Sequence, residues 1–211
     1  MTVLQPEKTV ASIRWLAAPT SPSWLEEANC YLDHLLIDHA HCERKAAGSA
    51  VQMMFRYLCE PGLAEALSPI AQEELEHFDR VLAVVKQRGR YLEPLPSPYY
   101  GATLSKAIRK GEPNRMLDAF LVAGLIEARS HERMALLADH CRDQDLRQLY
   151  SDLLVSEARH FGQYWLLCEQ RWDRALITQR LEQLAMVEVE ALTGQLKQPE
   201  DVRMHSVGVQ F

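Results

Sequence analysis

Apolar residues recur every three to four positions through most of the chain, which is the spacing of one face of an α-helix. The segments with this spacing are rich in Ala, Leu, Glu, Gln and Arg, which are good helix formers. Proline and glycine cluster between them, as at Pro61-Gly62 and from Gly111 to Pro113. No segment alternates with period two for long enough to indicate a strand. The pattern predicts an all-α protein with helices over residues 23–59, 63–88, 114–140, 143–170 and 173–196, with room for a break near the start of the first.

The lengths of the connections indicate how these helices pack. A Pro-Gly turn joins the first helix to the second, and an equally short break joins the third to the fourth, so each pair is expected to be antiparallel. The link over residues 89–113 is long and rich in proline, so it can run the full length of a bundle. We therefore expect residues 1–211 to form a single ferritin-like domain. It would comprise a four-helix bundle with one long crossover (23–170), an extra C-terminal helix (173–196) and an irregular tail (197–211).

Glutamates interrupt the apolar face of four of the predicted helices, at Glu43, Glu74, Glu127 and Glu157. In two helices a histidine follows three residues later, as ELEH at residues 74–77 and EARH at residues 157–160. Positions i and i+3 lie on the same helix face, one turn apart. Each of these two motifs can therefore direct a carboxylate and an imidazole to one point.

The spacing of these residues repeats in the two halves of the chain. Glu43 precedes Glu74 by 31 residues, and Glu127 precedes Glu157 by 30. At about 1.5 Å per residue, the chain reaches the turn and returns to a similar height, so the acidic groups converge at one level. Burial of uncompensated carboxylates costs several kcal/mol for each ion, whereas two divalent cations would balance four of them. Oxygen and nitrogen ligands suit iron or manganese, so the sequence predicts a dinuclear metal site formed by Glu43, Glu74, His77, Glu127, Glu157 and His160.

These six positions resemble the ferritin-like di-iron carboxylate pattern, with one Glu from each of two helices and Glu-x-x-His from each of the other two. Within that superfamily the chain resembles the tRNA 2-methylthio-isopentenyladenosine hydroxylase (MiaE-like) family. The resemblance rests on DHAHCERKAAGSA at residues 38–50, LEHF around His77, GLIEARSHER at residues 124–133 and SEARHF at residues 156–161. It covers about residues 12–195 and includes all six candidate ligands.

The resemblance implies a reaction and roles for the residues. It implies that Glu43 and Glu127 are terminal ligands, that Glu74 and Glu157 bridge two iron ions, and that His77 and His160 each cap one iron. The implied enzyme is a di-iron monooxygenase that uses O2 and an external electron donor, supplied by an unidentified reductase. Its implied substrate is the isopentenyl group of a hypermodified adenosine beside the tRNA anticodon. Alternatives of other classes remain open: an iron-storage, ferroxidase or peroxide-handling protein of similar bundle, or a metal-free helical RNA-binding or scaffold protein.

The charge distribution bears on the tRNA partner. A formal net charge of -6 argues mildly against binding to nucleic acid, but residues 86–115 carry +5. We expect this segment to contact tRNA phosphates, although a crossover whose charges only keep it soluble would show the same composition. The candidate contacts are the basic residues Arg88, Arg90, Arg109 and Lys110, with Tyr91, Tyr99 and Tyr100 available for base stacking.

Several residues near the candidate ligands have two interpretations. His39 and His131 lie four residues from Glu43 and Glu127, so either could hydrogen-bond a ligand or be an ordinary half-buried histidine. Tyr164, one turn beyond His160, either lines the substrate cavity or packs in the core. Arg129 and Arg133 are expected to form salt bridges at the surface.

The remaining composition indicates the compartment. No apolar stretch approaches the roughly 20 residues that span a bilayer, and the N-terminus does not resemble a secretory signal. A cytoplasmic protein, either a monomer or a small homo-oligomer, is the expectation. The five cysteines are widely spaced with no Cys-x-x-Cys pair, so they are expected to be reduced and buried.

Overall fold

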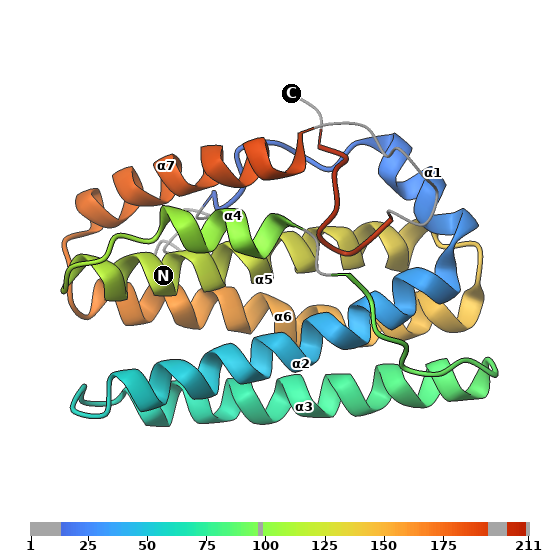
Figure 1. Ribbon diagram of the computed structural model, residues 1–211, viewed down its shortest axis with the longest axis horizontal. Helices are drawn as coiled ribbons and strands as arrows, with labels where there is room; N and C mark the ends of the chain where they lie inside the picture. Colours follow the sequence, from blue (N-terminus) through green and yellow to red (C-terminus); the bar gives the residue numbers. More distant parts are fainter. Residues whose placement is uncertain (1–13, 97–98, 194–201, 210–211) are drawn as a thin grey trace, which may run out of the picture.

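The computed structural model describes residues 14–96, 99–193 and 202–209, and every regular element in these ranges is helical (Figure 1). The helices are α1 (Pro22–Cys30), α2 (Leu32–Arg56), α3 (Leu63–Gln87), α4 (Tyr99–Ala107), α5 (Asn114–His140), α6 (Gln144–Glu169) and α7 (Arg174–Leu192). The described residues contain no strand beyond an isolated bridge between Thr20 and Val209. The prediction of an all-α, ferritin-like bundle is confirmed.

Four long helices form the bundle. Figure 1 shows α2 antiparallel to α3 and α5 antiparallel to α6, with the two pairs side by side. Gly62, in the turn between α2 and α3, has φ 73°, a left-handed conformation that glycine adopts without steric cost. The crossover after α3 returns the chain along the molecule, so that α5 runs in the same direction as α3 (Figure 1). This arrangement brings the middles of all four helices to one level.

The structure differs from the predicted elements in two places. The break allowed for near the start of the first predicted helix lies at Tyr31, between α1 and α2, but α2 ends at Arg56, before the predicted end at Cys59. No helix was predicted within the crossover, but it contains the helix α4, which packs against α7 and α5. Several prolines precede α4, and its 9 residues, Tyr99–Ala107, are too few for a periodic apolar pattern to indicate a helix.

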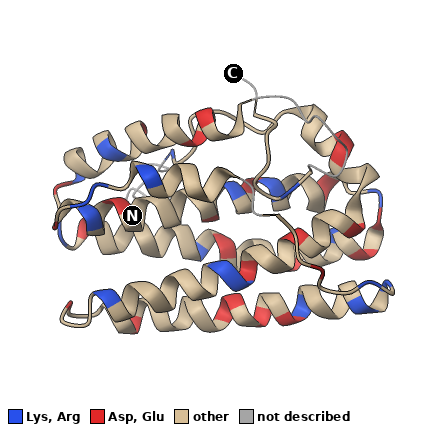
Figure 2. Ribbon diagram, in the orientation of Figure 1, with Lys and Arg blue, Asp and Glu red and all other residues tan. Residues whose placement is uncertain are grey.

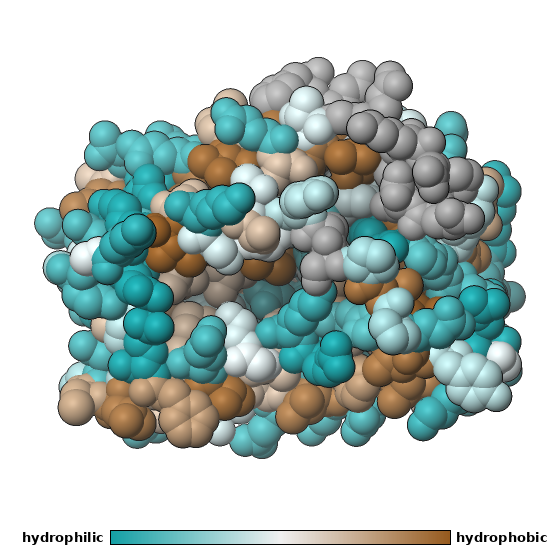
Figure 3. Space-filling view, in the orientation of Figure 1, coloured by the Kyte–Doolittle hydropathy of each residue, from teal (hydrophilic) through white to brown (hydrophobic). Residues whose placement is uncertain are grey.

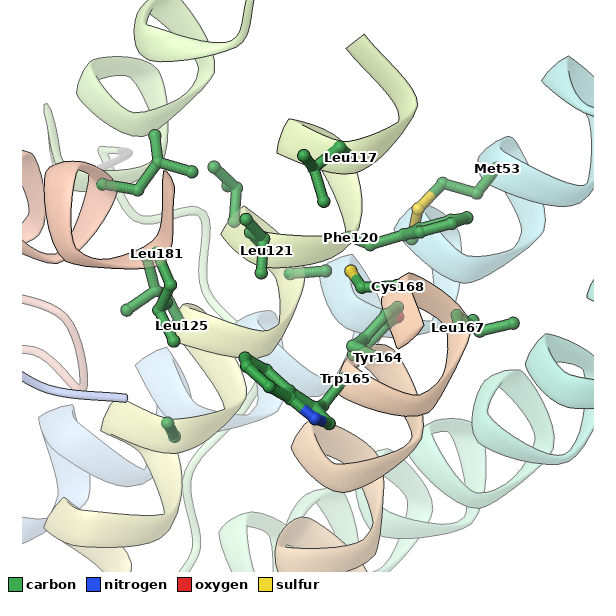
Figure 4. Close-up of a cluster of buried hydrophobic side chains, with 14 of the residues drawn as sticks. Met53, Leu117, Phe120, Leu121, Leu125, Tyr164, Trp165, Leu167, Cys168 and Leu181 are labelled. Atoms are coloured by element: carbon green, nitrogen blue, oxygen red, sulfur yellow. The ribbon is translucent and has the colours of Figure 1, made fainter. Parts of the chain in front are cut away.

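Two apolar clusters occupy the two ends of the bundle. In one, side chains from α2, α5, α6 and α7 meet around Phe120, Tyr164 and Leu181 (Figure 4). The other lies around Trp24, Leu36 and Val81 at the opposite end. A fully buried side chain of this size contributes about 1.5–3 kcal/mol to the free energy of folding. These clusters provide the stability that permits a polar layer between them.

Helix α5 is buried on nearly all sides, which corrects one prediction. Arg129 and Arg133 were expected at the surface, but both side chains are fully buried. The N-terminal segment from Trp15 to Thr20 contacts both arginines, and the C-terminal segment 202–209 contacts Arg133. A helix pattern cannot reveal such coverage because the covering segments are irregular.

The C-terminal segment 202–209 is held by buried hydrogen bonds. Arg133 Nη1 donates to the carbonyl oxygens of Met204 (2.8 Å) and Ser206 (3.0 Å), and the Met204 N–H donates to Asp38 Oδ2 (2.8 Å). The irregular conformation expected for the tail is present here, although the segment is buried. The predicted tail residues 197–201 and 210–211, and the end of the last predicted helix, lie outside the described residues.

The cysteines follow the prediction in part. All five are free, and Cys141 and Cys168 are buried, but Cys30 and Cys59 are exposed, so the expectation of burial is wrong for these two. They lie near the ends of α1 and α2, where the chain turns at the surface. No helix among the described residues is long and apolar enough to cross a membrane.

Candidate metal centre

The six candidate ligands converge in the polar layer between the two apolar clusters. They form two overlapping groups: Glu43, Glu74, His77 and Glu157, and Glu74, Glu127, Glu157 and His160. Within each group, one nitrogen or oxygen atom from each residue lies within 4.8 Å of the others. All six residues are buried. Glu74 and Glu157 belong to both groups, which is the arrangement expected of carboxylates shared by two metal ions.

The two histidines present the same ring nitrogen to the centre of the cluster. His160 Nδ1 lies 2.6 Å from Glu74 Oε1, and His77 Nδ1 lies 3.1 Å from Glu157 Oε1. A nitrogen lone pair and a carboxylate oxygen at such distances repel each other unless a proton or a cation compensates them. The geometry therefore requires positive charge at the centre.

Two outer contacts explain why Nδ1 faces inward. His160 Nε2 donates to Glu73 Oε2 (2.9 Å), and His77 Nε2 donates to Ser156 Oγ (2.9 Å), whose own hydroxyl donates to the Leu153 carbonyl (2.8 Å). With the proton held on Nε2, each Nδ1 retains its lone pair for a metal ion. Sequence reasoning missed Glu73 and Ser156. The signal was present, because each residue immediately precedes a shared glutamate and contacts the histidine of the other Glu-x-x-His motif.

Buried polar atoms without hydrogen-bond partners test whether a metal fits. They include both carboxylate oxygens of Glu74, Oε1 of Glu157, and Nδ1 of His77 and of His160. Buried polar groups in proteins are nearly always satisfied, so a group of unpaired polar atoms that face one point indicates a cation site. The donor set of oxygen and imidazole nitrogen fits a di-iron or dimanganese carboxylate site.

The electrostatics of the metal-free cluster show the same requirement. Burial, together with the neighbouring carboxylates, raises the pKa of Glu74 and of Glu127 well above their ordinary range. Burial alone would lower the pKa of His77, but the neighbouring carboxylates of Glu157 and Glu43 raise it to about 9. Protons thus neutralise the cluster when no metal does, and metal binding would displace them.

Glu73→Ala is expected to weaken metal binding by about 10- to 100-fold, because His160 loses the carboxylate that fixes its tautomer and orientation. Titration of the metal-free protein with Fe(II) under anaerobic conditions measures this affinity. Glu76→Ala is the matched control, since Glu76 is an exposed glutamate on the same helix. Equal affinities of the two variants for iron would contradict the role of Glu73.

The structure separates the two additional histidine candidates. His39 Nε2 contacts Glu43 Oε1, and the His39 ring is fully buried. Burial alone would raise the pKa of the Glu43 carboxyl, but the contact with His39 lowers it. His131 instead packs edge-on against Phe161, with ring centroids 5.6 Å apart. Of the two, His39 is therefore the one that contacts a candidate ligand.

A cavity of about 400 Å³ leads to the cluster. It is lined by Glu127 and Tyr164 at the metal end, by Cys42 and Lys45 from α2, and by Tyr100 of α4. His205, from the C-terminal segment, completes the wall and stacks on Tyr100 with ring centroids 4.8 Å apart. Figure 3 shows the surface hollowed between α4 and α2. Tyr164 thus has both of the roles considered for it, because it lines the cavity and also belongs to the apolar core.

Three of the four basic residues predicted to contact tRNA are held by carboxylates. The pairs are Arg88 with Asp33 and Asp143 (2.6 and 2.5 Å), Arg90 with Glu93 (3.5 Å) and Arg109 with Asp118 (2.7 Å). Lys110 is exposed. Among the crossover tyrosines, Tyr91 and Tyr99 are exposed, whereas Tyr100 is buried and stacks on His205. Contact between these residues and tRNA stays a prediction.

Comparisons with known proteins identify similar tRNA hydroxylases. The family model described as tRNA-(MS[2]IO[6]A)-hydroxylase (MiaE) matches residues 7–206. A Pseudomonas putida protein named tRNA 2-(methylsulfanyl)-N(6)-isopentenyladenosine(37) hydroxylase is 36% identical, over 91% of this chain and 92% of that protein. The Salmonella typhimurium protein of the same name is 28% identical, over 75% of this chain and 76% of its own length.

A solved structure adds a second comparison. It is named "Protein 43 with aldehyde deformylating oxygenase activity from Synechococcus" and is 75% identical, with a TM-score of 0.93. The match covers 94% of this chain and 98% of that one. The family model spans nearly the whole chain and includes every residue of the buried cluster. The chain belongs to the MiaE family of tRNA hydroxylases.

Proposed function

We propose that this protein is a di-iron monooxygenase that hydroxylates the isopentenyl group of 2-methylthio-isopentenyladenosine next to the tRNA anticodon. The observation that carries the proposal is the buried cluster of four carboxylates and two imidazoles at the end of an open cavity, in a chain of the MiaE family. In this proposal Glu43 and Glu127 are terminal ligands, Glu74 and Glu157 bridge the irons, and His77 and His160 each bind one iron.

The reaction inserts one oxygen atom of O2 into a C–H bond, and the other leaves as water after uptake of two electrons and two protons. Such a C–H bond offers no handle to acid–base catalysis, so bound iron supplies the oxidising chemistry. The protein's own residues bind and orient the substrate. Tyr100, Tyr164 and Ile126 give the cavity an aromatic and aliphatic wall, which suits a prenyl group and excludes water from the reacting carbon.

The proposal includes partners that the chain itself does not contain. An external reductase supplies the electrons, since the described residues hold no cysteine pair or second metal cluster that could deliver them. tRNA is the substrate, in keeping with the family. We further propose a cytoplasmic location, where tRNA is modified, and a monomer or small homo-oligomer.

Anaerobic loading with Fe(II), followed by O2, a chemical reductant and tRNA that contains the prenylated base, tests this function. We expect mass spectrometry of the nucleosides to show the addition of one oxygen atom to the prenylated adenosine. Size-exclusion chromatography separates the iron-storage alternative, because storage requires a large closed shell. Absence of the oxygenated nucleoside from reactions with fully loaded protein would reject the proposal.

A second candidate activity has one specific observation in its favour. The solved structure that is 75% identical to this chain is named for aldehyde deformylating oxygenase activity. The buried cluster and its cavity do not by themselves distinguish an aldehyde from a prenylated base as substrate. The same loaded protein, assayed with a long-chain aldehyde and analysed for hydrocarbon and formate, compares the two activities directly.

A further inference from the structure

A second, smaller cavity adjoins the cavity that leads to the metal centre. It has a volume of about 190 Å³ and is lined by His41, Arg44 and Lys45 from α2 and by residues 94–96 of the crossover. Asp38 and Lys45 line both cavities, so the two share a wall. Basic positions midway along α2 are visible beside the crossover in Figure 2. A cationic recess thus lies directly beside the opening to the candidate active site.

Arg44 is held in place at this recess. Its Nη2 atom donates to His41 Nδ1 (3.1 Å), and His41 Nε2 donates to the Glu93 carbonyl oxygen in the crossover (2.8 Å). The carbonyl can only accept, so His41 carries its proton on Nε2 and offers Nδ1 to the arginine. The contact uses one of the five N–H donors of the guanidinium, and the others can bind a ligand.

The acidic group of the recess is already engaged. Asp38 accepts the Met204 N–H (2.8 Å) and lies 3.6 Å from the Arg203 guanidinium, so the C-terminal segment compensates its charge. Within the part of the chain that the structure describes, Arg44 forms no ion pair with a carboxylate, in contrast to the crossover arginines Arg88 and Arg109. The recess therefore has the charge of an anion site.

We propose that this recess is a phosphate subsite, in which Arg44 and Lys45 bind the backbone phosphate of the nucleotide whose prenylated base enters the larger cavity. The inference rests on the proposed function. Proteins that read RNA loops take bases that are turned out of the stack, and the phosphate next to such a base lies within one nucleotide of it. The larger, apolar cavity leads to the metal centre and suits the prenylated base. The adjoining cationic recess suits the phosphate of the same nucleotide.

Binding of an anticodon stem-loop with the prenylated adenosine, measured against salt concentration with metal-free protein, tests the subsite. The variant is Arg44→Gln/Lys45→Gln, and the control is Arg56→Gln/Arg142→Gln, which removes the same charge from exposed side chains that line neither cavity. The recess variant should bind at least about tenfold more weakly, and its salt slope should fall by about 0.7–0.9, the value for one phosphate contact. The control should change little, and thermal unfolding checks that both variants are folded.

A chemical change in the RNA sharpens the test. A stem-loop with a neutral methylphosphonate beside the prenylated adenosine should bind the parent protein more weakly, yet lose nothing further with the recess variant, because the two changes remove one interaction. Additive losses, or a salt slope that changes only when Arg88, Arg90, Arg109 and Lys110 are replaced, would overturn the subsite. If the iron-loaded parent leaves tRNA unmodified, the proposed function fails while the binding result still decides the subsite.

Discussion

Glu74→Ala protein is expected to bind fewer than two iron ions per chain and to lose hydroxylation. Glu74 belongs to both donor groups of the cluster, so its removal takes one ligand from each metal position. The loss of activity should exceed the roughly 10- to 100-fold expected when an outer residue such as Glu73 is replaced. Iron analysis and nucleoside mass spectrometry measure the two effects, and His160→Ala should give the same result from the other side of the centre.

Removal of the Glu74 charge should stabilise the metal-free protein, although it impairs iron binding. Burial and the carboxylates of Glu127 and Glu157 raise the pKa of Glu74 above its ordinary value of 4.5, so the folded state disfavours its ionised form. A raised carboxyl pKa means that stability is lost as the pH rises above that ordinary value. Glu74→Gln retains the shape without the charge and should raise the melting temperature of metal-free protein at neutral pH.

With iron bound, the parent should melt at a higher temperature than Glu74→Gln. Iron binds only the folded state, so it should raise the melting temperature of the parent but little that of Glu74→Gln. Glu76→Ala, an exposed change on the same helix, should follow the parent with and without iron. Full iron content and turnover in Glu74→Ala, or a metal-free Glu74→Gln protein less stable than the parent, would contradict the assignment of this carboxylate.

The bundle and the cluster could be predicted from the sequence because both depend on local periodicity. Helical spacing defines one face for each segment, and a repeated separation of 30 or 31 residues places Glu43 near Glu74 and Glu127 near Glu157 once the turns are short. No knowledge of packing between distant segments is needed for that step. The family resemblance then supplied the reaction, which geometry alone does not identify.

What the sequence did not reveal depends on contacts between segments far apart in the chain. Arg129 and Arg133 lie on the side of α5 that faces the irregular segments 14–20 and 202–209, and Arg129 also contacts Glu188 of α7. The recess beside Arg44 likewise requires the crossover to lie against α2. Irregular segments have no periodic pattern, so their position follows from the side chains that they cover.

Arg129→Met is expected to lower the free energy of unfolding by about 3–5 kcal/mol, which corresponds to about 6–20 °C in melting temperature for a domain of this size. The Arg129 guanidinium is fully buried and donates to both carboxylate oxygens of Glu188 on α7 (2.8 and 2.9 Å). Its loss leaves Glu188 charged and buried, with a hydrogen bond from the Tyr100 hydroxyl (3.2 Å) as weak compensation. Thermal and urea unfolding of the metal-free protein measure the change.

A double variant separates the unpaired charge from the loss of packing. Arg129→Met/Glu188→Leu removes both charges, so most of the stability should return, as it does when buried ion pairs are replaced by apolar residues of similar volume. Arg80→Gln is the comparison at the surface, where the Arg80–Asp152 pair (3.0 Å) is about half exposed and should contribute less than about 1 kcal/mol. If Arg129→Met is as mild as Arg80→Gln, or if the double variant is no more stable than Arg129→Met alone, Glu188 does not depend on Arg129 for its charge balance. The attachment of α7 to α5 would then rest on their apolar contacts alone.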